Sequence, residues 1–260
     1  MNSLEHKKNA FADFLEVLDT LRQKCPWDAK QTNESLRPNT IEEVYELADA
    51  LMTDDTESIK KELGDVLLHV AFYSKIASEQ NKFDIGDVCE ALTQKLIYRH
   101  PHIYGNVSAD SADEVSKNWE EIKLKEKNGN KTVLSGVPGA LPARIKASRI
   151  QEKAANIGFD WQNREDVWVK VKEEMAEVEE EIKAGNHDNI ETEFGDLLFA
   201  VINAARLYGV NPENALEKTN RKFISRFNHI EKRAIESGRK LKEMSLEEMD
   251  KLWEEAKKKE

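Results

Sequence analysis

The chain has 260 residues, of which 39% are hydrophobic and 34% charged, and its formal net charge is −11. This acidity argues against nucleic-acid binding through a broad basic face, because phosphate backbones are held mainly by clustered Lys and Arg. Its two cysteines are too few for a disulfide framework, and no apolar run approaches membrane-spanning length, so we expect a cytoplasmic protein with neither nucleic-acid nor membrane partners.

Helical periodicity runs through nearly the whole chain, whereas strand-like alternation is scarce. Apolar residues recur at the spacing of an amphipathic helix from Ile59 to Val70 and again from Val171 to Ile182. We therefore predict an all-α fold. The expected helices, in chain order, cover residues 4–24, 39–53, 57–79, 85–99 and 110–127 in the first half, then 142–156, 164–184, 188–208, 212–237 and 245–259 in the second.

A short segment rich in glycine and proline divides the two halves. Asn128 to Pro142 contains three glycines and two prolines in fifteen residues, a composition typical of interdomain linkers. The predicted organisation is an N-terminal helical-bundle domain over 1–127, a linker over 128–142 and a C-terminal helical-bundle domain over 143–260. The length allows each domain to bury a core of its own.

The same acidic motif occurs once in each half. Glu42-Glu43-Val44-Tyr45-Glu46 recurs as Glu173-Glu174-Met175-Ala176-Glu177, and the segment from Glu62 to Phe72 (ELGDVLLHVAF) recurs from Glu193 to Asn203 (EFGDLLFAVIN). Both motifs are displaced by 131 residues. Acidic residues that only solvate a surface need not keep the same spacing in both halves. The repeat therefore indicates two homologous domains that share a function.

Residues three apart project from one face of a helix, so the carboxylates of each motif lie on the same face. We therefore expect one cluster of carboxylates in each half. Like charges held this close repel strongly, so each cluster must take up protons or hold cations. Carboxylate oxygens without cysteine or histidine favour Mg²⁺, with Mn²⁺ as the alternative. The candidate metal ligands are Glu43, Glu46, Glu62 and Asp65 in the first copy and Glu174, Glu177, Glu193 and Asp196 in the second.

Cationic and aromatic side chains also recur in the two halves. The pair Lys95 and Arg99 corresponds to Lys222 and Arg226, in each case four residues apart on a predicted helix. A point charge beside a guanidinium suits a polyphosphate, although surface solubility explains either pair taken alone. A second repeated feature is a tryptophan, Trp119 or Trp253, which serves either as a core anchor or as a face on which a nucleobase stacks.

The sequence resembles the all-α nucleoside triphosphate pyrophosphohydrolases and, in its tandem form, the MazG family. The resemblance rests on the doubled acidic motif and runs over essentially the whole chain. Supporting stretches are Cys25-Pro26-Trp27-Asp28, Arg99-His100-Pro101-His102 and Gly158-Phe159-Asp160-Trp161. It implies Mg²⁺-dependent hydrolysis of a nucleoside triphosphate, ATP among them, to the monophosphate and diphosphate, with a broad nucleotide range and a house-cleaning role.

The resemblance also implies roles for individual residues. In the C-terminal half the four acidic ligands hold the metal, Lys170, Lys222 and Arg226 contact phosphates, and Trp253 contacts the nucleoside. Either Glu173 or a ligand carboxylate accepts the proton from the attacking water. The first half supplies the counterparts, including Lys95, Arg99 and Trp119. We expect the C-terminal site to be the principal catalyst, because the position that corresponds to Lys170 is Asn39.

Two alternatives stay open on the sequence. The first keeps the fold and narrows the substrate to deoxyuridine triphosphate or phosphoribosyl-ATP. The second makes the acidic helices a non-catalytic module that binds a nucleotide or a regulatory protein partner. Because small bundles with broad apolar stripes often complete their cores by pairing, we also expect a homodimer.

Overall fold

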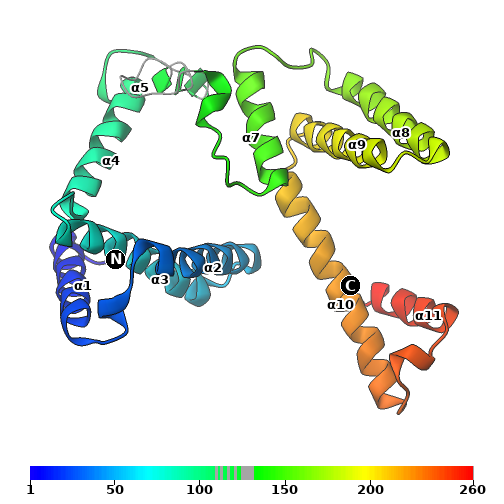
Figure 1. The fold of residues 1–260 in the computed structure, drawn as a ribbon, viewed down its shortest axis with the longest axis horizontal. Coiled ribbons are helices and arrows are strands. Elements are labelled where there is room, and N and C mark those ends of the chain that lie inside the picture. The colour runs from blue at the N-terminus through cyan, green and yellow to red at the C-terminus, as the bar shows by residue number, and fades with distance from the viewer. Residues whose placement is uncertain (109–110, 112–113, 116–117, 120–121, 124–131, 260) are drawn as a thin grey trace. The chain divides into compact units, whose positions relative to one another are not determined.

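The computed structural model describes residues 1–108, 111, 114–115, 118–119, 122–123 and 132–259. Helices dominate these residues, and none of them lies in a β-strand (Figure 1). The predicted all-α fold is therefore confirmed. The chain divides into two compact units, Met1–Ser108 and Ala109–Glu260. Across the described helices, none combines the length and the apolar character that crossing a bilayer requires.

The first unit is built from α1 (Leu4–Lys24), α2 (Asn33–Thr53), α3 (Thr56–Glu79), α4 (Ile85–Arg99) and the short α5 (Pro101–Tyr104). Its hydrophobic core lies where α1, the start of α2 and the second half of α3 meet. The buried side chains there are Leu18, Leu36, Ala71, Phe72 and Ile76.

One predicted boundary in this unit is wrong. We expected the second helix to begin at residue 39, after Pro38, but α2 begins at Asn33. Thr32 and Ser35 form a capping box, in which each side chain bonds the backbone N–H of the other residue. Pro38 is accommodated in the second turn because its missing N–H removes only one bond near the helix start.

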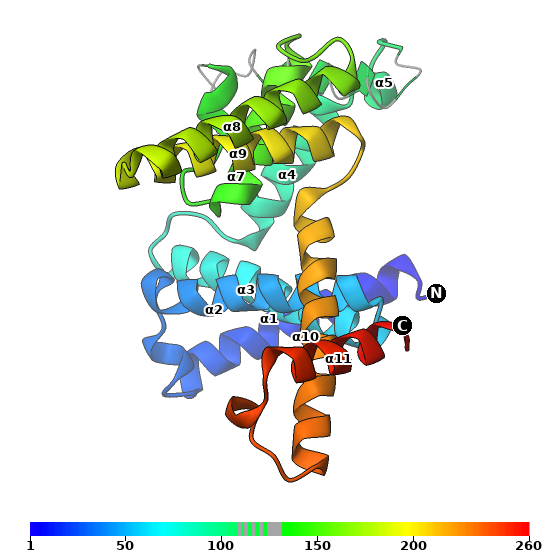
Figure 2. The same cartoon turned by 90° about the vertical axis from the view of Figure 1, so that its right-hand side faces the viewer.

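The second unit contains α7 (Ala143–Asn156), α8 (Val167–Ala184), α9 (His187–Leu207), α10 (Pro212–Glu236) and α11 (Leu246–Lys257). We expected α8 to begin at residue 164, but Arg164–Asp166 form a separate 3₁₀ turn. A core of Val167, Val171, Ala200 and Ala204 joins α8 to α9. The hairpin of α10 and α11 extends away from α8 and α9 in both views (Figures 1 and 2).

The predicted helix over 110–127 and the first residues of the predicted linker fall largely outside the described residues. Within the rest of that linker, Val133–Gly136 form a 3₁₀ turn that contacts α7. The predicted domain limits at 127, 128, 142 and 143 stay predictions.

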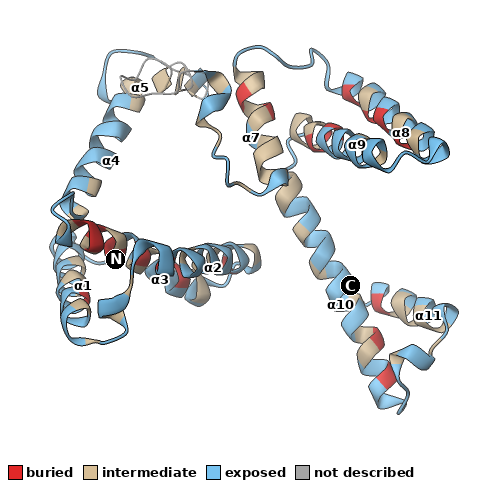
Figure 3. Cartoon of the chain, in the orientation of Figure 1, coloured by how far each residue is buried: buried red, intermediate tan, exposed pale blue. Residues whose placement is uncertain are grey.

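The apolar stripe that we identified on α3 does not face the core of its own unit. Leu63, Leu67 and Val70 are 53%, 41% and 42% exposed. The equivalent side chains of α9, Phe194, Leu198 and Val201, are 46%, 62% and 44% exposed. The buried residues of α3 lie mostly in its second half, from His69 to Ala77 (Figure 3). Each repeat therefore presents a second apolar face without cover from its own unit.

Candidate active site

Two helical hairpins, α2 with α3 and α8 with α9, position the acidic motifs. Each hairpin turns through two residues, Asp54 and Asp55 in the first and Gly185 and Asn186 in the second. Asp54 and Gly185 adopt positive φ angles of 54° and 72°, which end the first helix of each pair. The short turns make the helices antiparallel neighbours, so the first motif faces the second within each repeat.

The first acidic cluster comprises Glu43, Glu46, Glu62 and Asp65. Carboxylate oxygens of Glu43, Glu62 and Asp65 lie within 4.8 Å of one another, while Glu46 is exposed beside them. Glu62 is only 7% exposed, and its Oε2 is buried with no hydrogen-bond partner among the described residues. A buried, unpartnered carboxylate oxygen is costly, and a cation would satisfy it.

A lysine that the sequence analysis did not single out sits in this cluster. Lys61 Nζ lies 2.9 Å from Glu62 Oε1, 3.5 Å from Asp65 Oδ2 and 3.9 Å from Glu46 Oε2. The only sign of this role in the sequence is that Lys61 directly precedes Glu62. A lysine next to an acidic residue is too common for that to mark it as part of the site. The first cluster thus already holds one positive charge from the protein itself.

The second acidic cluster comprises Glu174, Glu177, Glu193 and Asp196. Oxygens of Glu174, Glu177 and Glu193 lie within 4.8 Å of one another, and Glu174 is only 5% exposed. Asp196 is exposed and lies outside that triad. Both hairpins therefore bring three of their four predicted ligands together. Two of the three are equivalent in the two repeats, since Glu43 corresponds to Glu174 and Glu62 to Glu193. The third is Asp65 in the first cluster and Glu177 in the second.

Lys170 borders the second cluster. Its Nζ lies 2.8 Å from Glu173 Oε1 and 2.8 Å from Glu174 Oε1. These hydrogen bonds raise the pKa of Lys170, so the side chain stays charged. Within the described part of the chain, this ammonium forms no ion pair with Glu177 or Glu193, the other two members of the triad. In contrast to Lys61, Lys170 approaches its cluster from the first helix of the hairpin, at one edge.

The carboxylates disturb one another in both clusters. Burial raises the pKa of Glu43, and the charges of Asp65, Glu46 and Glu62 raise it further, while Lys61 opposes them. This is the response expected of carboxylates held together without enough positive charge.

In the second cluster, a hydrogen bond with Glu174 raises the pKa of Glu177. Burial and the charges of Glu174 and Glu193 act in the same direction, and Lys170 opposes them. The neighbouring carboxylates thus favour the protonated form of Glu177. Hard oxygen donors with this geometry fit Mg²⁺ or Mn²⁺.

The predicted phosphate-binding residues of the second repeat lie on another part of the unit. Lys222 and Arg226 project from the middle of α10, and the Arg226 guanidinium lies 5.3 Å from the centre of the Trp253 ring on α11. Phe223 packs against the same ring at 5.0 Å. Trp253 is half-buried there, as expected of an anchor between the two helices.

Within this unit the structure does not bring Lys222 and Arg226 to the second cluster. Glu193 lies about 21 Å before the end of α9, and Lys222 lies about 15 Å along α10, at 1.5 Å per residue. The two helices diverge from their connection (Figures 1 and 2). A single unit therefore places its acidic ligands and its α10 cations apart.

The corresponding residues of the first repeat are Lys95, Arg99 and Trp119. Lys95 and Arg99 lie one turn apart at the end of α4. Trp119 belongs to the second compact unit, where Lys123 Nζ lies 5.3 Å from its ring centre. Their assignment to substrate stays a prediction.

Comparison with known proteins identifies the repeated domain. The family model described as "MazG nucleotide pyrophosphohydrolase domain" matches residues 31–104 and 162–231, the segments that carry the two acidic clusters. This chain belongs to the MazG family. The prediction of two homologous helical domains is confirmed by the double match.

Three relatives align with 95% or more of this chain. A protein of Thermotoga maritima named nucleoside triphosphate pyrophosphohydrolase/pyrophosphatase MazG is 43% identical over 95% of each chain. The nucleoside triphosphate pyrophosphohydrolase of Escherichia coli K12 is 39% identical over 97% of this chain and 98% of its own. The Bacillus subtilis protein YabN is 46% identical over 95% of this chain, which spans about half (51%) of YabN.

The position of Lys61 leads to a prediction about metal affinity. Replacing Lys61 with Met in a protein whose second cluster carries Glu174→Gln and Glu177→Gln should tighten Mn²⁺ binding to the first cluster, by roughly three- to tenfold after solvent screening. Titration calorimetry measures this change. Lys60→Met is the matched control, because Lys60 pairs with Glu57 outside the cluster. Unchanged or weaker binding in the Lys61 variant would show that its ammonium does not compete with the ion.

Proposed function

We propose that the C-terminal repeat hydrolyses nucleoside triphosphates to monophosphate and diphosphate, with Mg²⁺ or Mn²⁺ held by the second acidic cluster. As a MazG-family member, the chain is an enzyme that acts on acid anhydride bonds. The observation that carries the proposal is the convergence of Glu174, Glu177 and Glu193 within 4.8 Å, on helices matched by the family model.

The donor set favours a divalent ion over a purely protonated cluster. Glu174 is buried, and the protein supplies one ammonium, that of Lys170, at one edge of the cluster. Asp196, one turn beyond Glu193 on α9, would serve as the fourth ligand. When bound, the ion would lower the pKa of a coordinated water and neutralise charge on the phosphates. Magnesium prefers such sites because substrate phosphates complete its shell.

The chain's own residues have separate tasks in this proposal. Lys170 holds a phosphate beside the cluster, because its ammonium lies at the edge and keeps its charge. Glu173 is exposed and within reach of the same edge, so it is placed to accept a proton from water. Lys222 and Arg226 supply further charge to the polyphosphate.

The proposed substrate range can be tested directly. A broad range and a house-cleaning role are our proposal, and a narrow preference for deoxyuridine triphosphate or phosphoribosyl-ATP is the alternative within the fold. Diphosphate release from a panel of triphosphates, with and without Mg²⁺, separates these readings. Turnover of several nucleotides that disappears with EDTA supports the proposal, whereas metal-independent turnover or none would contradict it. Cytoplasmic location and a regulatory protein partner stay predictions.

We predict that the two repeats contribute unequally. Asp196→Asn should abolish turnover, at least a hundredfold, because it weakens the cluster that Lys170 borders. Asp65→Asn should leave most of the activity, because Lys61 already neutralises part of the first cluster. Steady-state diphosphate release measures both variants. Equal loss from either substitution would refute the asymmetry.

We also propose that the enzyme works as a homodimer whose active sites are completed between copies. The exposed apolar faces of the α3 and α9 hairpins offer self-complementary surface, which two-fold pairing covers. On α10, Phe223 and Ile224 are 57% and 56% exposed and extend this apolar surface. Because Lys222 and Arg226 project away from the acidic cluster of their own unit, a second copy is the source of cations for that cluster.

Mixing two inactive variants tests this arrangement. Glu177→Gln removes an acidic ligand, and Arg226→Ala removes a cation of α10. If sites form between copies, an equal mixture that exchanges subunits should regain about a quarter of wild-type activity, since half the dimers are mixed and each has one intact site. A mixture of Glu177→Gln with Glu193→Gln is the control, because both changes affect one hairpin. Failure to regain activity in the first mixture would place the sites within single copies.

A further inference from the structure

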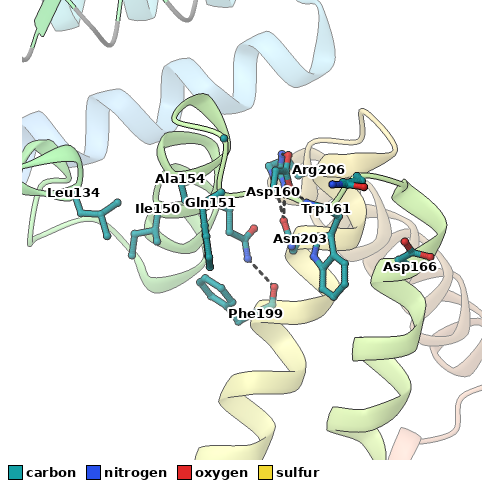
Figure 4. A pocket seen from close by; sticks show the side chains of 13 residues that line it. Leu134, Ile150, Gln151, Ala154, Asp160, Trp161, Asp166, Phe199, Asn203 and Arg206 are labelled. Carbon is teal, nitrogen blue, oxygen red and sulfur yellow. Dashed lines mark hydrogen bonds and ion pairs between the residues drawn. The ribbon is translucent and has the colours of Figure 1, made fainter.

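The two units differ in the cavities that border their acidic hairpins. In the second unit, a cavity of about 670 Å³ lies between α7 and α9, where Gln151 and Asn203 contribute amides and Trp161 an aromatic wall (Figure 4). Gln151 Oε1 is buried there with no hydrogen-bond partner among the described residues. In the first unit, a groove of about 710 Å³ lies between α2 and α3. The two cavities are similar in volume, but the groove of the first unit is strongly acidic.

Five carboxylates and one aromatic ring line this acidic groove. They belong to Glu42, Tyr45, Glu46 and Asp49 of α2, to Asp55 at the start of α3, and to Glu62 of α3. Among the described residues that line the groove, none is a lysine or an arginine. The groove therefore concentrates negative charge that its own walls do not neutralise.

The carboxylates of the groove are spread along it rather than gathered at one point. Glu42, Glu46 and Asp49 follow on one face of α2 at intervals of four and three residues, which are roughly 6 Å and 4.5 Å along the helix axis. In the part of the chain that the structure describes, no three of the groove's carboxylates converge within 4.8 Å, in contrast to the first acidic cluster. A single small ion therefore cannot neutralise the whole row.

One carboxylate oxygen in the groove lacks a partner. The Glu62 side chain is 9% exposed, and its Oε1 accepts a hydrogen bond from Lys61 Nζ at 2.9 Å. Glu62 Oε2 is buried without a hydrogen-bond partner among the described residues. Because an unpaired carboxylate oxygen is costly to bury, this atom calls for a donor from a bound molecule.

The protein itself places an alkylammonium against this part of the groove. Lys61 Nζ lies 2.9 Å from Glu62 Oε1 and 3.9 Å from Glu46 Oε2. An ammonium donates hydrogen bonds to carboxylates as well as attracting them by charge. The contact shows that an ammonium on a four-carbon stem fits between these two carboxylates.

Tyr45 adds an aromatic surface to the row of carboxylates. It is 53% exposed and follows Glu42 by three residues on the same face of α2. The face of a tyrosine ring attracts an organic cation and also packs against methylene groups. A hydrated divalent ion has no methylene groups to pack there. The groove therefore suits a chain that carries both ammonium and methylene groups.

The second repeat differs at these positions. In the aligned segments, Tyr45 corresponds to Ala176, which has no ring. Asn189 Nδ2 donates to Glu181 Oε2 at 3.1 Å across the second hairpin, at the positions of two residues that line the groove in the first. The protein thus bridges in the second repeat the space that is open in the first.

We propose that the acidic groove binds a linear aliphatic polyamine, with ammonium groups at Glu42, Glu46 and Asp49 and methylene groups against Tyr45. A three- or four-carbon chain separates neighbouring ammonium groups by roughly 5–6 Å, close to one helical turn. The ammonium at Glu46 also donates to Glu62 Oε2, the oxygen that Lys61 leaves unpaired. Because the groove lies in the first unit, this binding does not depend on catalysis at the second cluster.

Titration calorimetry with spermidine at constant ionic strength tests this assignment. The intact chain should bind spermidine about tenfold more tightly than 1-aminobutane, which carries a single ammonium. Glu42→Gln and Asp49→Asn should each weaken spermidine binding roughly three- to tenfold, and Tyr45→Ala should weaken it similarly. Glu180→Gln is the matched control, because Glu180 corresponds to Asp49 in the second repeat, and it should leave spermidine binding unchanged.

Three outcomes of this titration overturn the proposal. The first is unchanged spermidine binding in both carboxylate variants of the groove. The second is an equal loss in the Glu180→Gln control, which would mean that spermidine only screens the net charge. The third is equal affinity for spermidine and 1-aminobutane. Thermal unfolding checks that each variant is folded.

A further comparison separates the polyamine from a divalent ion. Glu43 belongs to the first acidic cluster but does not line the groove. In a protein that carries Glu174→Gln and Glu177→Gln, Glu43→Gln should weaken Mn²⁺ binding about tenfold and change spermidine binding less than about twofold. Glu42→Gln should have the reverse effect. If either change weakens both ligands equally, the groove attracts any cation and the proposal fails.

Discussion

The structure depends on carboxylates that two antiparallel helices hold against one another. Glu62 and Glu174 are nearly buried, and both clusters have a member with a raised pKa, Glu43 in the first and Glu177 in the second. The stability associated with such a group is present below its unfolded pKa and is lost as pH rises through its folded value. At neutral pH a cation would offset this repulsion, and that is the physical basis of the metal site that we propose.

The two repeats differ in how the protein offsets the repulsion between these carboxylates. In the first repeat, Lys61 lies within 3.9 Å of carboxylate oxygens of Glu46, Glu62 and Asp65, and Phe72 is buried in the core of the first unit. The second repeat keeps Lys170 at the edge and leaves a cavity lined by Gln151 and Asn203. These differences are the basis of the unequal contributions that we predict for the two repeats. The lysines come from different helices, so alignment alone does not pair them.

The helices and the carboxylate clusters could be predicted from the sequence because both follow from fixed spacing along a helix. The start of α2 could not, since the Thr32 and Ser35 cap outweighs the breaking effect of Pro38. Periodicity identified the apolar stripe of α3 but did not tell which face its own unit covers, and Leu63 is exposed. Gln151 carried no sequence signal, because its importance lies in one unpaired oxygen that only tertiary packing reveals.

The most direct measurement is anomalous diffraction from crystals grown with Mn²⁺, at a wavelength near its absorption edge. The account predicts a peak bonded to carboxylate oxygens of Glu174, Glu177 and Glu193, with Asp196 turned toward it. A map with no peak there at saturating Mn²⁺, or a peak held only by other side chains, would contradict the claim that this cluster exists to bind a divalent ion.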